Sequence, residues 1–151
     1  MYWFMMLHIS LEILMPNTKK VQKMLDFQLI LEKLQSTNSP VIVEGKRDTL
    51  ALKRIGFKGE IIELNDGTSV LATIERIFQA YGSSTEFIIL TDWDKTGNKL
   101  AKQLISYGKS CDLIPNDNLR RTLSNITSKE ISCVEELPTF AFSLGYKAHS
   151  L

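Results

Sequence analysis

Two aspartates one residue apart follow an apolar run and precede a glycine. The stretch covers residues 89–101, ILTDWDKTGNKLA, and its acidic residues are Asp92 and Asp94. In an extended chain, residues i and i+2 point the same way, so both carboxylates can face one cation. Without a cation, clustered carboxylates repel one another and resist ionisation. Mg²⁺, which binds one or two carboxylates together with water and phosphate oxygens, turns that repulsion into attraction.

A third carboxylate follows an earlier apolar run. Glu44 comes directly after PVIV and directly before Gly45. In open parallel sheets, polar ligands bind beyond the carboxyl ends of the strands, so we expect Glu44, Asp92 and Asp94 to converge there. The alternative is that these aspartates only cap a helix, as Asp commonly does at strand-to-helix turns without any metal. A second carboxylate motif at another strand end favours the cation site.

These positions require strands that alternate with helices. The periodicity predicts an amphipathic helix over residues 19–35, a loop over 36–40, and then four short strands at 40–45, 60–64, 87–91 and 110–115. Each strand is followed by a predicted helix. The first and the last of these helices cover residues 48–55 and 118–126. The second carries Val70, Leu71, Ile74, Ile77 and Phe78 on one face, and the third has Leu100, Ala101, Leu104 and Ile105 inward and stops at Gly108. Such a pattern predicts an α/β fold, a Rossmann-like open, mainly parallel sheet of about four strands flanked by helices, with an N-terminal helical extension.

The carboxylate motifs also resemble a known family. VIVEGKRDTLAL at residues 41–52, followed by FIILTDWDKTGNKLA at 87–101, is similar to the Toprim domain of topoisomerases, bacterial-type primases, certain nucleases and recombination proteins. The shared features are an apolar strand ending in Glu-Gly, then Asp48 and an apolar helix, and an apolar strand ending in Asp-x-Asp-x-x-Gly. The resemblance divides the chain into an N-terminal extension with its amphipathic helix (1–38), a Toprim-like domain (39–138) and a C-terminal tail (139–151).

The resemblance implies roles for single residues. Asp92 and Asp94 would hold Mg²⁺, or Mn²⁺ in its place, and Glu44 would act as a general acid or base or share in metal binding. This is coherent chemistry, because a metal neutralises phosphate charge and orients an attacking oxygen while a nearby carboxylate handles the proton. Gly45 and Gly97 would let the backbone turn sharply and let a phosphate approach a helix N-terminus.

Departures from the family narrow the activity. DNA-cutting topoisomerases carry a third acidic residue where this chain has Thr96, and primases need extensions that we do not find. The form DxDxxG followed by Lys99 is more similar to primases and to the nuclease that matures small ribosomal RNA. We therefore expect a small, stand-alone, nuclease-like Toprim protein that carries out phosphoryl transfer or phosphodiester cleavage on RNA or DNA.

Charge limits how nucleic acid can bind. The chain has 151 residues and a formal net charge of +1, so nucleic acid must be attracted by a local patch. The candidates for phosphate contacts are Lys46, Arg47, Lys95 and Lys99. The alternative for each is a solvated helix face.

Other residues near the motifs are expected to be structural. We expect Trp93 to pack or be partly exposed rather than stack on a base, and Arg120 and Arg121 to lie on the polar face of a helix. In SKEISCVEELP the acidic residues Glu130, Glu135 and Glu136 are expected to cap or to be solvated rather than to enter the crevice.

The N-terminal residues and the cysteines indicate in which cellular compartment the protein is expected. Residues 1–15 are apolar, yet His8, Ser10 and Glu12 interrupt a run too short for a membrane span, which predicts a poorly ordered extension and no membrane partner. Met15 or Met24 is an alternative natural start. The only two cysteines show no zinc-like spacing with the two histidines, which favours a reduced, cytoplasmic protein.

Two rivals to a nuclease stay open. The first is a haloacid-dehalogenase-type phosphatase, in which the first Asp of Asp-x-Asp-x-Thr is phosphorylated. It leaves Glu44-Gly45 unexplained, and little chain remains for its later motifs. The second is a non-catalytic module that binds metal and nucleic acid within a larger RNA- or DNA-processing complex. The exposed edge of so small a sheet is also compatible with a homodimer.

Overall fold

The computed structural model describes residues 18–146. The elements in chain order are α2 (Thr18–Ser36), β1 (Val41–Val43), α3 (Lys46–Arg54), β2 (Ile61–Glu63), α4 (Val70–Tyr81), β3 (Glu86–Ile89), α5 (Lys95–Ser110), β4 (Ile114–Asn116), α6 (Asn118–Thr127), the 3₁₀ turn η1 (Val134–Glu136) and α7 (Leu137–Ser143). The extension predicted over residues 1–15 lies outside the described residues. No helix within residues 18–146 is long and apolar enough to cross a membrane.

The four strands form one parallel sheet in the order β2-β1-β3-β4. The predicted α/β class and the parallel four-stranded sheet are therefore confirmed. Because β1 and β3 are the two central strands, the residues that follow them leave the sheet side by side. This arrangement determines which side chains can meet at the carboxyl edge.

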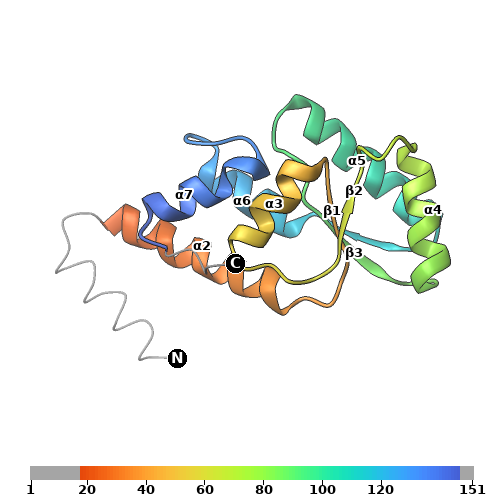
Figure 1. Cartoon of the computed structure of the whole chain (residues 1–151), viewed down its shortest axis with the longest axis horizontal. Helices are drawn as coiled ribbons and strands as arrows, with labels where there is room; N and C mark the ends of the chain where they lie inside the picture. The colour runs from red at the N-terminus through yellow and green to blue at the C-terminus, as the bar shows by residue number, and fades with distance from the viewer. Residues whose placement is uncertain (1–17, 147–151) are drawn as a thin grey trace.

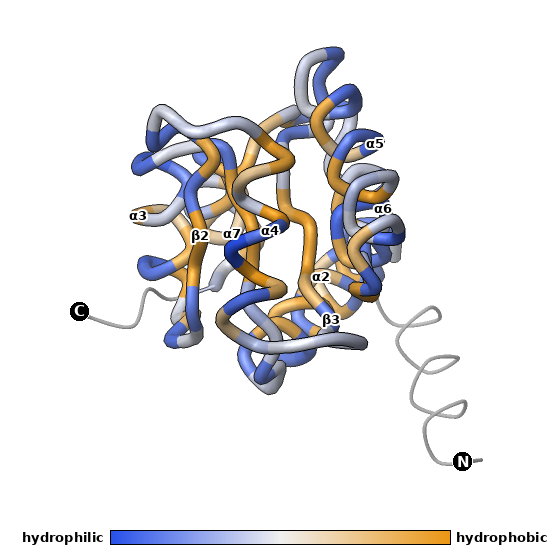
Figure 2. Tube along the Cα trace, turned by 90° about the vertical axis from the view of Figure 1, so that its right-hand side faces the viewer, coloured by the Kyte–Doolittle hydropathy of each residue, from blue (hydrophilic) through white to orange (hydrophobic). Residues whose placement is uncertain are grey.

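Both faces of the sheet are buried, which explains the continuous apolar strands. Val41 and Val43 belong to one core cluster, with residues of α2, α3, α6 and α7. Ile42, between them, belongs to a second cluster on the opposite face, with residues of α4 and α5. This alternation is the period of two that a strand imposes. Figure 1 shows the sheet between these two groups of helices, and Figure 2 shows hydrophobic residues following the strands.

The elements at either end of the sheet domain share its first core. Phe27 of α2 and Phe140 of α7 meet edge to face, with ring centroids 5.3 Å apart. Both rings are buried in the cluster that contains Val41 and Val43. The division at residues 38/39 and 138/139 remains a prediction, and the helices outside those limits help to cover the sheet.

On the predicted face of α4, Ile74 and Ile77 are buried, and Leu71 and Phe78 are 39% and 40% exposed. Two other details of the predicted elements were wrong. Gly108 does not stop α5, which continues to Ser110. The fourth strand begins at Ile114 rather than at residue 110, because α5 occupies the earlier positions.

Candidate metal and nucleic-acid site

Glu44 and Asp92 lie together at the carboxyl edge of the two central strands. β1 and β3 pair with Val41 opposite Ile88 and Ile42 opposite Ile89. Extended by two residues, this register places Glu44 opposite the residue before Asp92. The Asp92 N–H donates to Glu44 Oε2 at 2.8 Å. The sheet thus brings the Glu44 carboxylate onto the backbone of Asp92, close enough for the Asp92 charge to act on it.

The Asp92 side chain is held by a segment much later in the chain. Its Oδ1 accepts the Val134 N–H at 2.9 Å, and Val134 begins the turn η1. The neighbouring Trp93 donates its N–H to the carbonyl of Ser132 at 3.0 Å and its indole N–H to that of Ile131 at 2.9 Å. Trp93 therefore packs partly buried, as expected, and the segment before α7 borders the site.

Asp94 combines both interpretations considered for it. It is the N-cap of α5, and its Oδ1 accepts the Gly97 N–H at 2.7 Å. Helix capping is therefore a real role of Asp94. The residue is nevertheless exposed, and its charge raises the pKa of Glu44, so it lies near the other two carboxylates.

The donor set fits a hard cation such as Mg²⁺. Glu44, Asp92 and Asp94 supply oxygen ligands only, and one oxygen of each accepts a backbone N–H. Within the described part of the chain, no three acidic, histidine or cysteine side chains are gathered into a ready metal cage. Mg²⁺ does not need one, because it usually keeps several waters and binds one or two carboxylates plus phosphate oxygens. The structure thus provides a pair of carboxylates with a third nearby, not a closed three-ligand site.

Burial and like charge raise the pKa of two carboxyl groups here. Burial is the main cause for Glu44, and the charges of Asp92 and Asp94 add to it, so its pKa rises to about 7 although the Asp92 N–H acts in the opposite direction. Asp48 is 7% exposed, and burial and the Asp92 charge raise its pKa to about 6. Its Oδ2 accepts the Gly45 N–H at 3.0 Å, which caps α3. Asp48 was identified from the sequence as part of the Toprim-like motif, but no role was predicted for it.

The two glycines are not required here for a left-handed backbone, and the predicted approach of a phosphate to them stays a prediction. Gly45 and Gly97 both lack the left-handed backbone that demands glycine. Gly97 is buried, and a Cβ on it would lie 1.8 Å from the carbonyl oxygen of Asp92. Gly97 is therefore needed because α5 begins directly against the Asp92 backbone. A Cβ on Gly45 would meet only the side chain of Asn65, at 3.1 Å.

Arg120 is the site residue that sequence reasoning missed. It was expected on the polar face of α6, and that expectation is wrong, since it is 6% exposed. Its Nε donates to the Thr91 carbonyl at 2.9 Å, and its Nη2 donates to the Asp92 carbonyl at 2.7 Å and to Asn98 Oδ1. Burial lowers the pKa of Arg120, whereas the charges of nearby carboxylates raise it. Arg121 behaves as expected, exposed and paired with Asp117 at 3.3 Å.

The four proposed phosphate contacts lie at two helix starts. Lys46 and Arg47 open α3, and Lys95 opens α5 with Lys99 one turn later. All four are exposed. Both helices start within a few residues of Glu44 and Asp92, so the basic residues follow the carboxylates closely along the chain.

The acidic residues before α7 are mainly surface groups, as expected. Glu135 lies 3.6 Å from Arg47, and Glu130 pairs with Lys23 at 2.7 Å. Glu135 is thus tied to the rim of the site through Arg47. Glu136 is exposed.

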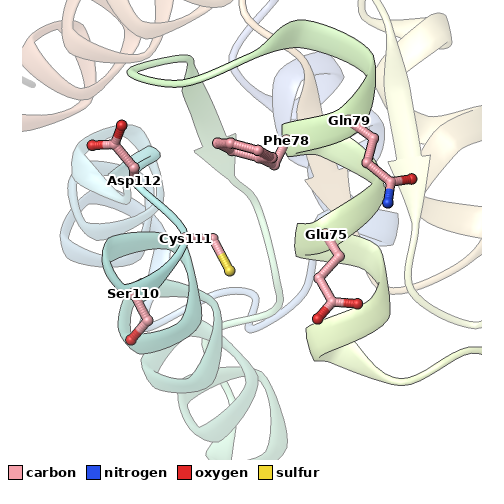
Figure 3. Close-up of a pocket in the computed structure, with 6 residues that line it drawn as sticks. All are labelled: Glu75, Phe78, Gln79, Ser110, Cys111 and Asp112. Carbon is pink, nitrogen blue, oxygen red and sulfur yellow. The ribbon is translucent and has the colours of Figure 1, made fainter.

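A separate hollow of about 380 Å³ lies between α4 and the end of α5, lined by Glu75, Phe78, Gln79, Ser110, Cys111 and Asp112 (Figure 3). The 16 residues of α5 separate it from the carboxylates. At 1.5 Å per residue that is about 24 Å, so this hollow is not part of the site.

A parallel sheet whose central strands end in Glu-Gly and Asp-x-Asp-x-x-Gly defines a Toprim-type domain. A family model described as "Toprim domain" matches residues 39–126, more than half of the chain. The chain therefore belongs to the Toprim family, and within it to the UPF0292 proteins, to which the relatives below belong by name. Membership indicates a metal-dependent function related to nucleic acid.

A UPF0292 protein from Methanosarcina acetivorans is 37% identical over 129 residues, covering 85% of this chain and 87% of the relative. Another from Thermococcus gammatolerans is 40% identical over 111 residues, 74% of this chain and 80% of the relative. A solved structure, a putative protein from Aquifex aeolicus, has a TM-score of 0.60 at 22% identity and covers 72% of this chain and 95% of its own. That likeness shows the fold.

Proposed function

We propose that this protein is a Mg²⁺-dependent enzyme that cleaves phosphodiester bonds in nucleic acid, RNA or DNA. One observation carries the proposal: the Asp92 N–H binds the Glu44 carboxylate at 2.8 Å, so Glu44 of one strand end lies against the acidic residue that follows the neighbouring strand. Both residues closely precede helix starts that carry exposed basic residues. Metal ligands, a proton acceptor and phosphate-binding groups are thus within one edge of the sheet.

Each group has a distinct task in this reaction. Asp92 and Asp94 would hold Mg²⁺, and the bound ion would supply neutralisation of phosphate charge. Glu44 would either join them as a ligand or stay free of the ion and transfer a proton. Glu44 can gain or lose a proton near neutral pH, because burial raises its pKa to about 7, which suits a general acid or base. Lys46, Arg47, Lys95 and Lys99 bind backbone phosphates and orient the substrate without reading its sequence.

Calorimetric titration with Mg²⁺ or Mn²⁺, together with a nuclease assay on mixed RNA and DNA, tests the proposal. The wild type should bind metal and cleave, and Asp92→Asn/Asp94→Asn should lose both. The matched control is Asp112→Asn, an exposed aspartate whose positive φ of 56° suits asparagine. If the wild type binds no metal even with nucleic acid present, the carboxylates serve only the turn and the proposal is withdrawn.

A second candidate is a non-catalytic module of a larger RNA- or DNA-processing complex, alone or as a homodimer. It is supported by the capping role of Asp94, which needs no metal and no reaction. Binding of nucleic acid that weakens with salt, without any cleavage, would favour this module. Glu44→Gln separates both candidates from a haloacid-dehalogenase-type phosphatase, which should keep its activity on small phosphoesters.

A further inference from the structure

Arg120 stands out because a charged side chain is almost fully buried outside the two motifs. It reaches the site from α6, the helix after the last strand of the sheet. A buried charge is costly unless it is paired, and a well-packed hydrophobic side chain often stabilises a protein as much or more. Packing of α6 alone therefore gives no reason for an arginine.

The acceptors of Arg120 all lie in one short segment, residues 91–98, which connects β3 to the first turn of α5 and is called the loop below. Thr91 and Asp92 are where the chain leaves β3, and Asn98 lies in the first turn of α5. Asp94 lies between these anchor points. A planar guanidinium can hold several acceptors in a fixed geometry, whereas a lysine ammonium is a point charge.

The same loop is tight enough that its geometry is determined by such anchors. The Asp92 carbonyl oxygen that accepts from Arg120 occupies the place that a Cβ on residue 97 would take, and the Thr91 hydroxyl donates to the Gly97 carbonyl at 2.8 Å. A shift of the Asp92 backbone would therefore move both its N–H, bound to Glu44, and its carboxylate. The positive charge of Arg120 also acts on Glu44, Asp92 and Asp94 and reduces their mutual repulsion.

We propose that Arg120 is a positioning residue of the carboxylate site: its guanidinium fixes the loop from Thr91 to Asn98 so that Asp92 meets Glu44 and can share a cation with it. The inference rests on the proposed function for the cation, and on the described contacts alone for the positioning. Asn98 is the side-chain partner in this arrangement.

Two measurements on Arg120→Lys and Arg120→Met test this, with Arg121→Lys as the control from the adjacent, exposed position. The first is hydrogen exchange of the Asp92 amide in metal-free protein, read by NMR. We expect exchange at least about tenfold faster in both Arg120 variants and unchanged in the control, under conditions where urea titration shows all proteins folded. If the Asp92 amide of Arg120→Lys is as well protected from exchange as in the wild type, the proposal is wrong, because a positive charge without the planar guanidinium would then be enough to hold the loop.

The second measurement is Mg²⁺ affinity by calorimetry. Loss of a positioning contact to a metal ligand typically weakens metal binding about 10- to 100-fold, and we expect a loss in that range for Arg120→Lys and none for Arg121→Lys. Asn98→Ala should weaken binding too, and less than additively with Arg120→Lys, because both remove one contact. Equal affinity of Arg120→Lys and wild type refutes the positioning role. If the wild type binds no Mg²⁺, the proposed function fails and the amide exchange decides the positioning alone.

Discussion

Replacement of Gly97 by alanine tests how closely α5 approaches the site. The added Cβ would lie 1.8 Å from the Asp92 carbonyl oxygen, 2.5 Å from its carbon and 2.9 Å from the Asp92 Cα. Real Cβ contacts are essentially never shorter than 3.0 Å, so the backbones must separate by at least 1.2 Å (3.0 − 1.8). The obstacle is main chain, which cannot rotate away as a side chain can.

The cost follows from the bonds that such a shift breaks. Gly97 accepts from Thr91 at 2.8 Å and donates to Asp94 at 2.7 Å, and the Asp92 carbonyl accepts from Arg120 at 2.7 Å. Each bond contributes about 1 kcal/mol net. Overpacking adds about 1–3 kcal/mol, and the higher helix propensity of alanine returns about 1 kcal/mol. We expect Gly97→Ala to lower the free energy of unfolding by about 3–5 kcal/mol.

Urea denaturation followed by circular dichroism measures this loss, with Gly45→Ala as the matched control. A Cβ on Gly45 meets the end of the flexible Asn65 side chain at 3.1 Å, so the control should lose about 1 kcal/mol or less, mainly as a poorer N-cap. If Gly97→Ala unfolds within about 0.5 kcal/mol of the wild type, which is the ordinary effect of a harmless surface change, α5 does not start against Asp92 as described.

Two further predictions follow from shifted pKa values. The pKa of Asp48 is raised from 3.8 to about 6, so its proton is lost from the unfolded chain first, and stability falls as pH rises between these values. The amide oxygen of Asp48→Asn can still accept the Gly45 N–H. At 1.36 kcal/mol per pKa unit, the free energy of unfolding of this variant should exceed that of the wild type by up to about 3 kcal/mol at pH 8 and by nothing at pH 4. Parallel pH–stability curves for the two proteins would contradict this. Burial raises the pKa of Cys133 to about 11. In a Cys111→Ser variant the Cys133 thiol should therefore react slowly with a disulfide reagent at pH 8 and quickly after denaturation. Equal reaction rates before and after denaturation would disprove the raised pKa.

The parts of the molecule that the sequence predicts are those set by local pattern. Runs such as Val41–Val43 are apolar without interruption, which only a sheet covered on both faces explains. The carboxylates follow these runs, so their meeting at one edge follows from parallel pairing. Glu44 and Asp92 could thus be named from spacing alone.

What the sequence could not predict depends on contacts between distant elements. Arg120 lies three residues before the buried Leu123 and Arg121 lies nearly opposite it, so helical periodicity could have separated the two. Nothing local, however, identifies the Thr91 and Asp92 carbonyls as the acceptors of Arg120. Gly108 was expected to end α5, yet a Cβ there would lie 2.8 Å from the Phe87 ring, so this glycine serves helix-to-sheet packing. The Val134 N–H is a backbone group, and a backbone donor has no residue type by which it could be recognised.

The same contacts explain how the fold holds three carboxyl groups at one edge of the sheet. Glu44 accepts from Asp92, Asp92 from Val134 and Asp94 from Gly97, and every donor is a backbone N–H fixed by the fold. A structural zinc site is formed by its metal and unfolds without it. Here the carboxylates are held by the strand register, the start of α5 and the turn before α7, with the buried Arg120 charge nearby. The fold itself therefore determines where the three carboxyl groups lie, and this placement is what the proposed cation site depends on.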